Sequence, residues 1–315
     1  MGPPETGWRG GKEMQALRTP DDRFVNLPDF PFAPHYAEID DLEGGTLRVH
    51  HLDEGPPDGP VMLLLHGEPS WSFLYRSMIP ILVDAGFRCI APDLVGFGRS
   101  DKPTRLADFS YERHVAWLTS HVFEALDLTG ITMVCQDWGG LLGLRLLAAA
   151  PERFSFVVAA NTMLPDGTTE LSEGFFNWKA LAASLDPLPS GMVIDLGTTS
   201  TLSAEIVAAY DAPFPDASFT AGPKVFPELV VTSPDMPSAA ENRAAWATLS
   251  EVTVPFLTAF SDADPVLGEE YARLRAEIPG AEGQPHTTIA GGGHFLQEDC
   301  GPELARVVID FARRA

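Results

Sequence analysis

The chain has 315 residues, of which 45% are hydrophobic and 21% charged, a composition typical of folded globular proteins and not of disordered ones. Its 44 acidic and 21 basic residues give a net charge of −23, which argues against nucleic acid and anionic membrane surfaces as partners because like charges repel. A small neutral molecule suits this charge better, and we expect the protein to be a monomer.

Strands and helices alternate from about residue 45 to residue 162. Residues 46–54 and 61–67 predict strands, and the second is apolar on both faces, as in the middle of a sheet. The following elements are expected in this order: a helix over 73–86, a strand over 88–94, a helix over 111–128, a strand over 131–137, a helix from 138 to near 151, and a strand over 154–162. This alternation predicts an α/β fold with a mostly parallel central sheet and helices on both faces.

The alternation breaks between residues 163 and 235, where prolines and scattered aromatic side chains predict an insertion of short helices and loops. It resumes over 252–264 and 286–295, and residues 302–314 predict a final amphipathic helix. We therefore expect a core made of residues 14–162 and 236–315, with residues 163–235 forming a helical cap.

The cysteines and the N-terminal segment indicate the cellular compartment in which the protein works. Cys89, Cys135 and Cys300 are too few for a disulfide framework, and the first two stand in apolar runs where buried free thiols are expected. Residues 1–13 are rich in glycine and proline, have no apolar core for a signal peptide, and predict a disordered extension. No apolar run reaches the roughly 18 residues of a membrane helix. We expect a cytoplasmic protein.

A candidate nucleophile stands in VCQDWGG, residues 134–140, where an apolar strand ends at Asp137 and a glycine-rich helix begins at once. This is the strand–turn–helix context of a nucleophile elbow, with aspartate in the place that serine usually holds. The free N–H groups at the start of the helix favour a carboxylate there. Taken alone, Asp137 is explained equally well as an ordinary helix N-cap.

Three further candidates follow other predicted strands. His66 and Gly67 begin HGEPSW, where folds of this kind place an oxyanion-hole N–H, although a buried, hydrogen-bonded histidine in a turn is the simpler explanation. Asp264 stands in FSDADPVLG and His294 in GGGHF. The order Asp137, Asp264, His294 is nucleophile, acid, histidine, as in α/β-hydrolases.

Six segments carry a family resemblance: HGEPSWSFLYR, APDLVGFGRSDKP, CQDWGG, EGFFNWK, DPVLG and GGGHFLQE. Together they resemble the haloalkane dehalogenases, an α/β-hydrolase family, in the branch that stabilises halide with two tryptophans. The resemblance runs from about Met14 to the C-terminus and includes the cap. HGEP and QDWGG together are specific to this family.

The resemblance implies roles for the matching residues. Asp137 would be the nucleophile, His294 the base and Asp264 the acid. Trp138 and Trp178 would bind the halide, although Trp178 taken alone is better explained as core filler. The remaining implied positions are the oxyanion-hole N–H groups of Glu68 and Trp138 and the substrate-pocket residues Phe175, Val266 and Leu267.

The implied reaction is the hydrolysis of a haloalkane to a primary alcohol, a halide ion and a proton through an alkyl ester on Asp137. A carboxylate, with a reference pKa near 4, is already ionised and can displace halide at an sp³ carbon, whereas serine would first need deprotonation. Indole N–H groups stabilise the departing halide, and His294 then activates water. We expect no cofactor and no metal, because no Cys/His ligand spacing is present.

Three alternatives stay open from the sequence. An epoxide hydrolase shares the aspartate nucleophile but uses two cap tyrosines, and only Tyr210 falls within the expected cap. A fluoroacetate-type dehalogenase would carry arginines just after the nucleophile, where the nearest here is Arg145. A receptor or scaffold of the same fold would have lost a catalytic residue, and this sequence retains them all.

Overall fold

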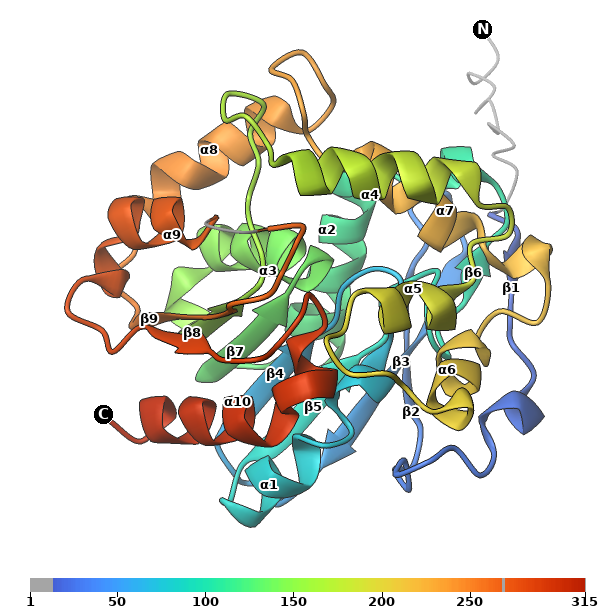
Figure 1. Cartoon of the computed structure of the whole chain (residues 1–315), viewed down its shortest axis with the longest axis horizontal. Helices are drawn as coiled ribbons and strands as arrows, with labels where there is room; N and C mark the ends of the chain where they lie inside the picture. Colours follow the sequence, from blue (N-terminus) through green and yellow to red (C-terminus); the bar gives the residue numbers. More distant parts are fainter. Residues whose placement is uncertain (1–13, 268–269, 315) are drawn as a thin grey trace, which may run out of the picture.

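The computed structural model describes residues 14–267 and 270–314, and the predicted N-terminal extension lies outside the described residues. An eight-stranded sheet runs through the centre, in the order β10-β9-β8-β7-β4-β5-β3-β2 (Figure 1). Its strands are β2 (His35–Asp40), β3 (Thr46–Glu54), β4 (Val61–Leu65), β5 (Arg88–Pro92), β7 (Ile131–Gln136), β8 (Phe154–Ala160), β9 (Phe256–Ser261) and β10 (Thr287–Ile289). The short strands β1 (Ala16–Leu17) and β6 (Lys102–Pro103) form a separate antiparallel pair.

The sheet is mostly parallel, as the sequence predicts. The six strands from β10 to β5 run parallel, while β3 lies antiparallel to β5 and β2 antiparallel to β3. Strand β4 lies between β7 and β5, and its Met62 to Leu65 are fully buried. Burial on both faces explains why this strand has no polar alternation.

Helices cover both faces of the sheet. Leu63 and Leu65 of β4 face one apolar cluster with α2, α3, α8 and α9, while Met62 and Leu64 face another with α1 and α10. These helices are α1 (Ile79–Asp84), α2 (Tyr111–Thr119), α3 (Trp138–Ala149), α8 (Ala239–Leu249), α9 (Tyr271–Glu277) and α10 (Leu296–Ala312). The α/β fold with helices on both faces is thereby confirmed.

The segment between β8 and α8 contains helices and no strand, and we call it the α4–α7 segment. Its helices are α4 (Glu173–Ser184), α5 (Ser190–Leu196), α6 (Ala204–Asp211), the short η6 (Ala217–Phe219) and α7 (Ala221–Leu229). The segment lies to one side of the sheet, where α4 passes above α3 (Figure 1). Its role as a cap stays a prediction.

Several elements differ from the sequence predictions. The helix expected over 73–86 is split into the 3₁₀ turn η2 (Ser72–Tyr75) and α1, and the one expected over 111–128 ends in a π-helical turn, η4 (Ser120–Ala125). The last helix begins at residue 296 instead of 302 and is kinked at Cys300, which has non-helical backbone angles. The kink lies just before Pro302, which has no N–H to donate. Strand β2 and helices α8 and α9 were not expected.

The remaining short turns of helix connect the larger elements. They are η1 (Asp21–Phe24), η2 (Ser72–Tyr75), η3 (Leu106–Asp108), η4 (Ser120–Ala125), η5 (Pro151–Arg153) and η7 (Pro279–Ala281). Over the part of the chain that the structure describes, no helix has both the length and the apolar character to cross a membrane.

Candidate active site

Asp137 occupies a strained turn between β7 and α3. Its backbone has φ 50° and ψ −127°, a conformation that costs about 1–3 kcal/mol and is held by the surrounding structure. The turn also needs glycines nearby. A Cβ on Gly139 would lie 2.1 Å from the carbonyl oxygen of Leu65, and one on Gly67 would lie 2.3 Å from Asp137 Oδ1. This is the geometry of a nucleophile elbow.

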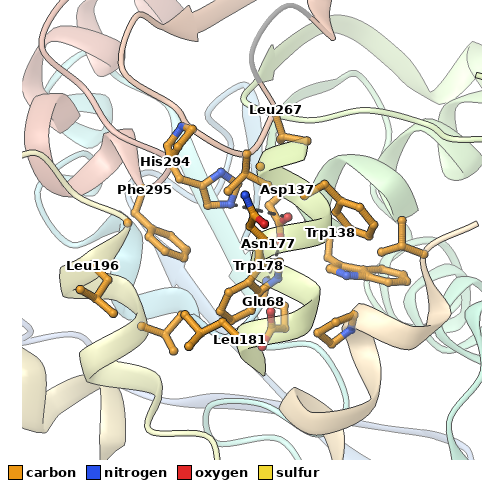
Figure 2. A pocket seen from close by; sticks show the side chains of 18 of the residues that line it. Glu68, Asp137, Trp138, Asn177, Trp178, Leu181, Leu196, Leu267, His294 and Phe295 are labelled. Atoms are coloured by element: carbon orange, nitrogen blue, oxygen red, sulfur yellow. Dashed lines mark hydrogen bonds and ion pairs between the residues drawn. The ribbon is translucent and has the colours of Figure 1, made fainter. Parts of the chain in front are cut away.

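His294 lies between the carboxylates of Asp137 and Asp264, and Figure 2 shows it beside Asp137. Its Nδ1 is 3.0 Å from Oδ2 of Asp264, and its Nε2 is 3.6 Å from Oδ2 of Asp137. Asp264 is itself fixed, because its Oδ1 accepts hydrogen bonds from the backbone N–H groups of Val266 (2.8 Å) and Leu267 (3.3 Å). The three strand-end residues predicted from their order in the chain are thus brought together.

Asp262, two residues before Asp264, has a different environment. It is exposed, and its Oδ1 accepts a hydrogen bond from the backbone N–H of Gly291 at 2.7 Å. The structure therefore distinguishes the two aspartates of this loop, and Asp264 is the one that contacts His294.

The electrostatics of this cluster favour an imidazolium. Burial alone would lower the pKa of His294, but the carboxylates of Asp264 and Asp137 outweigh it and raise the pKa to about 10. Burial likewise opposes ionisation of Asp264, yet the charge and hydrogen bond of His294 and the two backbone N–H groups leave the pKa of Asp264 below its usual value.

The backbone N–H of Glu68 donates to Asp137 Oδ1 at 2.8 Å, so one oxygen of the carboxylate already lies at a hydrogen-bond donor. Trp138 is the first residue of α3, and its N–H is among those that a helix leaves free at its start. The Glu68 side chain is only 4% exposed, and burial followed by the charge of Asp137 raises the pKa of this carboxyl well above its usual value.

A cavity of about 300 Å³ lies against these groups. Both candidate halide-binding tryptophans line it, as do the three predicted pocket residues, Phe175, Val266 and Leu267. Trp138 is buried, with its ring centre 4.5 Å from that of Phe226. Trp178 is half-buried, packs against a small apolar cluster of α4 and α5, and lines the cavity as well.

Sequence reasoning missed three cavity residues on α4, which are Gly174, Asn177 and Leu181. Asn177 and Leu181 line the cavity together with Gly174 and Trp178 (Figure 2). The positions 174, 177, 178 and 181 recur at the spacing of one helix face, so helical periodicity in this segment could have found them. Leu181 and Leu196 remain 41% and 63% exposed, which places them where the cavity meets solvent.

Two buried amides that sequence reasoning also missed hold the histidine loop. Gln136 Nε2 donates to the carbonyl oxygen of His294 at 3.1 Å, and Asn161 Nδ2 donates to the same oxygen at 3.1 Å. Both follow the pattern already used for Asp137, since they stand at the ends of β7 and β8. Position alone does not distinguish them from other strand-end residues.

His66 has the simpler of its two expected roles. Its side chain is fully buried, with Nδ1 2.9 Å from the Gly67 carbonyl oxygen and Nε2 accepting from the Leu94 N–H at 3.0 Å. It does not line the cavity. Its hydrogen bonds fix the turn that presents the Glu68 N–H.

The groups that the alternative functions need are engaged elsewhere. Tyr210 is fully buried, donates its hydroxyl to Glu298, and does not line the cavity, and no tyrosine is among the described residues that do. Arg145 pairs with Glu112 and Asn242.

The described residues also offer little for a metal or a disulfide. Among them, no three His, Cys, Asp or Glu side chains are grouped to hold a metal ion. Cys89 and Cys135 are buried free thiols, and Cys300 is a partly exposed one.

Comparisons with known proteins agree with this geometry. The family model of the α/β hydrolase fold matches residues 60–299. The chain is 55% identical to a haloalkane dehalogenase of Psychrobacter cryohalolentis, over 95% of this chain and 98% of the relative, and 49% identical to one of Mycolicibacterium paratuberculosis over the same shares. The tetrameric structure of the haloalkane dehalogenase DpaA from Paraglaciecola agarilytica matches with a TM-score of 0.83 and 36% identity, covering 93% of this chain and 97% of that one.

Proposed function

Because the chain belongs to the haloalkane dehalogenases of the α/β-hydrolase fold, we propose that it hydrolyses a haloalkane to a primary alcohol, a halide ion and a proton through an alkyl ester on Asp137. The observation that carries the proposal is that the two Asp137 oxygens have different neighbours. Oδ1 accepts the Glu68 N–H at 2.8 Å, while Oδ2 faces His294 at 3.6 Å.

In the first step, Oδ2 attacks the carbon that bears the halogen, and the carbon–halogen bond breaks with its electron pair leaving on the halide. Oδ1 becomes the carbonyl oxygen of the ester and stays at the Glu68 N–H. We assign the halide to the indole N–H groups of Trp138 and Trp178, which can only donate and so interact more strongly as negative charge develops. Both side chains line the cavity beside Asp137.

In the second step, His294 Nε2 takes a proton from water, which attacks the ester carbonyl carbon. The negative charge then develops on Oδ1, where the N–H groups of Glu68 and Trp138 form the oxyanion hole. Asp264, at 3.0 Å from Nδ1, holds the imidazole in the tautomer whose Nε2 is free to accept. Collapse of this intermediate breaks its bond to the alkoxide, which takes the proton of the new hydroxyl and leaves as the alcohol, so that the Asp137 carboxylate is regenerated. The proton taken from water stays on His294 until it passes to solvent.

The substrate is a small neutral haloalkane. The cavity of about 300 Å³ accepts a short alkyl chain, and Phe175, Val266 and Leu267 supply apolar walls. We assign the α4–α7 segment the role of a cap, since Trp178 and Phe175 of α4 line the cavity from above the strand ends. The free cysteines support a reducing cytoplasm as the location. The expected monomeric state is testable by light scattering.

The test is a comparison of substrates followed by a trapped intermediate. The enzyme is incubated with 1,2-dibromoethane, 1-bromobutane and an epoxide, while bromide and acid release are followed. Turnover of the bromoalkanes is expected, and activity on the epoxide alone would reject the proposal. His294→Gln should then release one bromide per enzyme and leave a mass adduct on Asp137, because the base acts only in the second step.

A further inference from the structure

Two loops that are far apart in the sequence meet beside the cavity. One is the segment 197–200, which follows α5, and the other is the histidine loop, residues 291–295. Gly197 lines the cavity, and its carbonyl oxygen accepts the backbone N–H of His294 at 2.7 Å. A Cβ on Gly293 would lie 2.4 Å from the same oxygen, so this close approach requires glycine.

One carboxylate joins these two loops. Asp299, in the first turn of α10, accepts the backbone N–H groups of Thr199 (3.0 Å) and Ser200 (2.9 Å) and the Ser200 hydroxyl (2.6 Å). On its other side it accepts the backbone N–H of Gly293 at 2.8 Å, the residue before His294. Burial opposes its ionisation, but these hydrogen bonds from Ser200, Thr199 and Gly293 leave the pKa of Asp299 below its usual value. We call these contacts the clasp.

The clasp restrains the main chain on the N-terminal side of His294, which the other contacts of this residue do not fix. Asp264 fixes the imidazole ring through Nδ1, and Gln136 and Asn161 fix the main-chain carbonyl oxygen. The main-chain N–H of His294 and the residue before it are fixed by Gly197 and Asp299. The base is therefore held from the sheet on one side and from the α4–α7 segment on the other.

We propose that Asp299 is a positioning residue for the base: by binding the segment after α5 to the histidine loop, it places His294 for ester hydrolysis and couples that placement to the wall of the cavity. The inference rests on the proposed function, because only there does His294 act in the second step and not in the first. Loss of the clasp should consequently slow hydrolysis of the alkyl-enzyme and spare its formation.

The experiment measures the two steps separately. Wild type and Asp299→Ala are mixed with excess 1,2-dibromoethane in a rapid-quench instrument, and the bromide burst gives the rate of alkylation. Decay of the ester adduct, followed by mass spectrometry, gives the rate of hydrolysis. A misplacement of about 1 Å can cost roughly a hundredfold, so we expect hydrolysis to fall by roughly ten- to a hundredfold while alkylation changes less than about twofold. The alkyl-enzyme should accumulate.

Three further variants serve as controls. Glu303→Ala removes an exposed carboxylate from the same helix and should leave both rates unchanged. Asp299→Asn keeps one acceptor oxygen for the backbone N–H groups and should give a smaller loss in the same step. If Asp299→Ala does not fold, Ser200→Ala, which removes only the hydroxyl contact, is expected to slow hydrolysis selectively by a few-fold.

Equal slowing of alkylation and hydrolysis would overturn the proposal, and so would a lowered melting temperature with both rates unchanged. Either result would make the clasp a purely structural contact. Failure of the proposed function has a different signature, because wild type would then release no bromide at all.

Discussion

The reaction proposed for this site removes one of the two charges that hold His294 protonated. In the free enzyme, the carboxylates of Asp264 and Asp137 outweigh the effect of burial and raise the pKa of His294 to about 10. Alkylation converts the Asp137 carboxylate into a neutral ester. We predict that this step lowers the pKa of His294, so that the imidazole becomes a base only when there is an ester to hydrolyse.

The magnitude follows from the geometry. His294 Nε2 lies 3.6 Å from Asp137 Oδ2. At this separation and an effective dielectric constant of about 20, two unit charges interact by about 4.6 kcal/mol. Because about 1.4 kcal/mol corresponds to one pKa unit, loss of the Asp137 charge should lower the pKa of His294 by about 3 units. The imidazolium of the free enzyme would then lose its proton at a correspondingly lower pH.

The assay is an NMR titration of protein labelled in its histidine rings, with Asp137→Asn standing in for the neutral ester. The His294 signal, assigned by its loss in His294→Gln, should titrate about 3 pH units lower in Asp137→Asn than in wild type. Asp262→Asn removes an exposed carboxylate that does not contact His294 and should leave the titration unchanged. An unaltered His294 titration in Asp137→Asn, with Asp137→Ala agreeing, would refute the reasoning.

Three other predictions follow from the site and the core. Asp264→Asn should lower kcat by several orders of magnitude, while Asp262→Asn should be mild, because only Asp264 contacts His294; steady-state bromide release compares them. Trp178→Phe removes a donor that contributes about 1.5–3 kcal/mol, so bromide affinity should fall roughly ten- to over a hundredfold in a fluorescence titration, and unchanged affinity would return Trp178 to a packing role. Burial lowers the pKa of His114 to about 3, so the unfolded chain binds a proton that the folded one does not, and stability is lost as pH falls below about 6.5. We expect the free energy of unfolding, measured with urea, to fall between pH 8 and pH 5 by about 2 kcal/mol less in His114→Phe than in wild type.

The fold could be predicted largely because its strands are apolar on both faces. Leu63 and Leu64 occupy adjacent positions on opposite faces of β4 and are both fully buried, which leaves an uninterrupted apolar run in the sequence. Asp137, Asp264 and His294 could be chosen because Asp137 directly follows β7 and the other two lie in the loops after β9 and β10, and the carboxyl ends of parallel strands meet along one edge. The edge strand β2 escaped prediction because only one of its six residues is buried and it carries no such run.

The rest of the site depends on contacts between distant segments, which no local pattern shows. Asn177 and Leu181 line the cavity because α4 turns that face inward, and the rotation of a helix is set by its packing. The same holds for Asp299, whose carboxylate oxygens accept hydrogen bonds from Thr199 and Ser200, about a hundred positions earlier in the chain. In the sequence it is one acidic residue among the 44 aspartates and glutamates.

Leu181 and Leu196 are exposed to water and also line the cavity. They form an apolar rim at the entrance, which favours apolar molecules over polar ones. An alkyl chain moving from water onto such a surface gains about 0.8 kcal/mol for each buried CH₂ group. The alcohol made from a bromoalkane forms hydrogen bonds with water, so the same rim binds the substrate more strongly than the product. The entrance therefore favours entry of the bromoalkane and release of the alcohol.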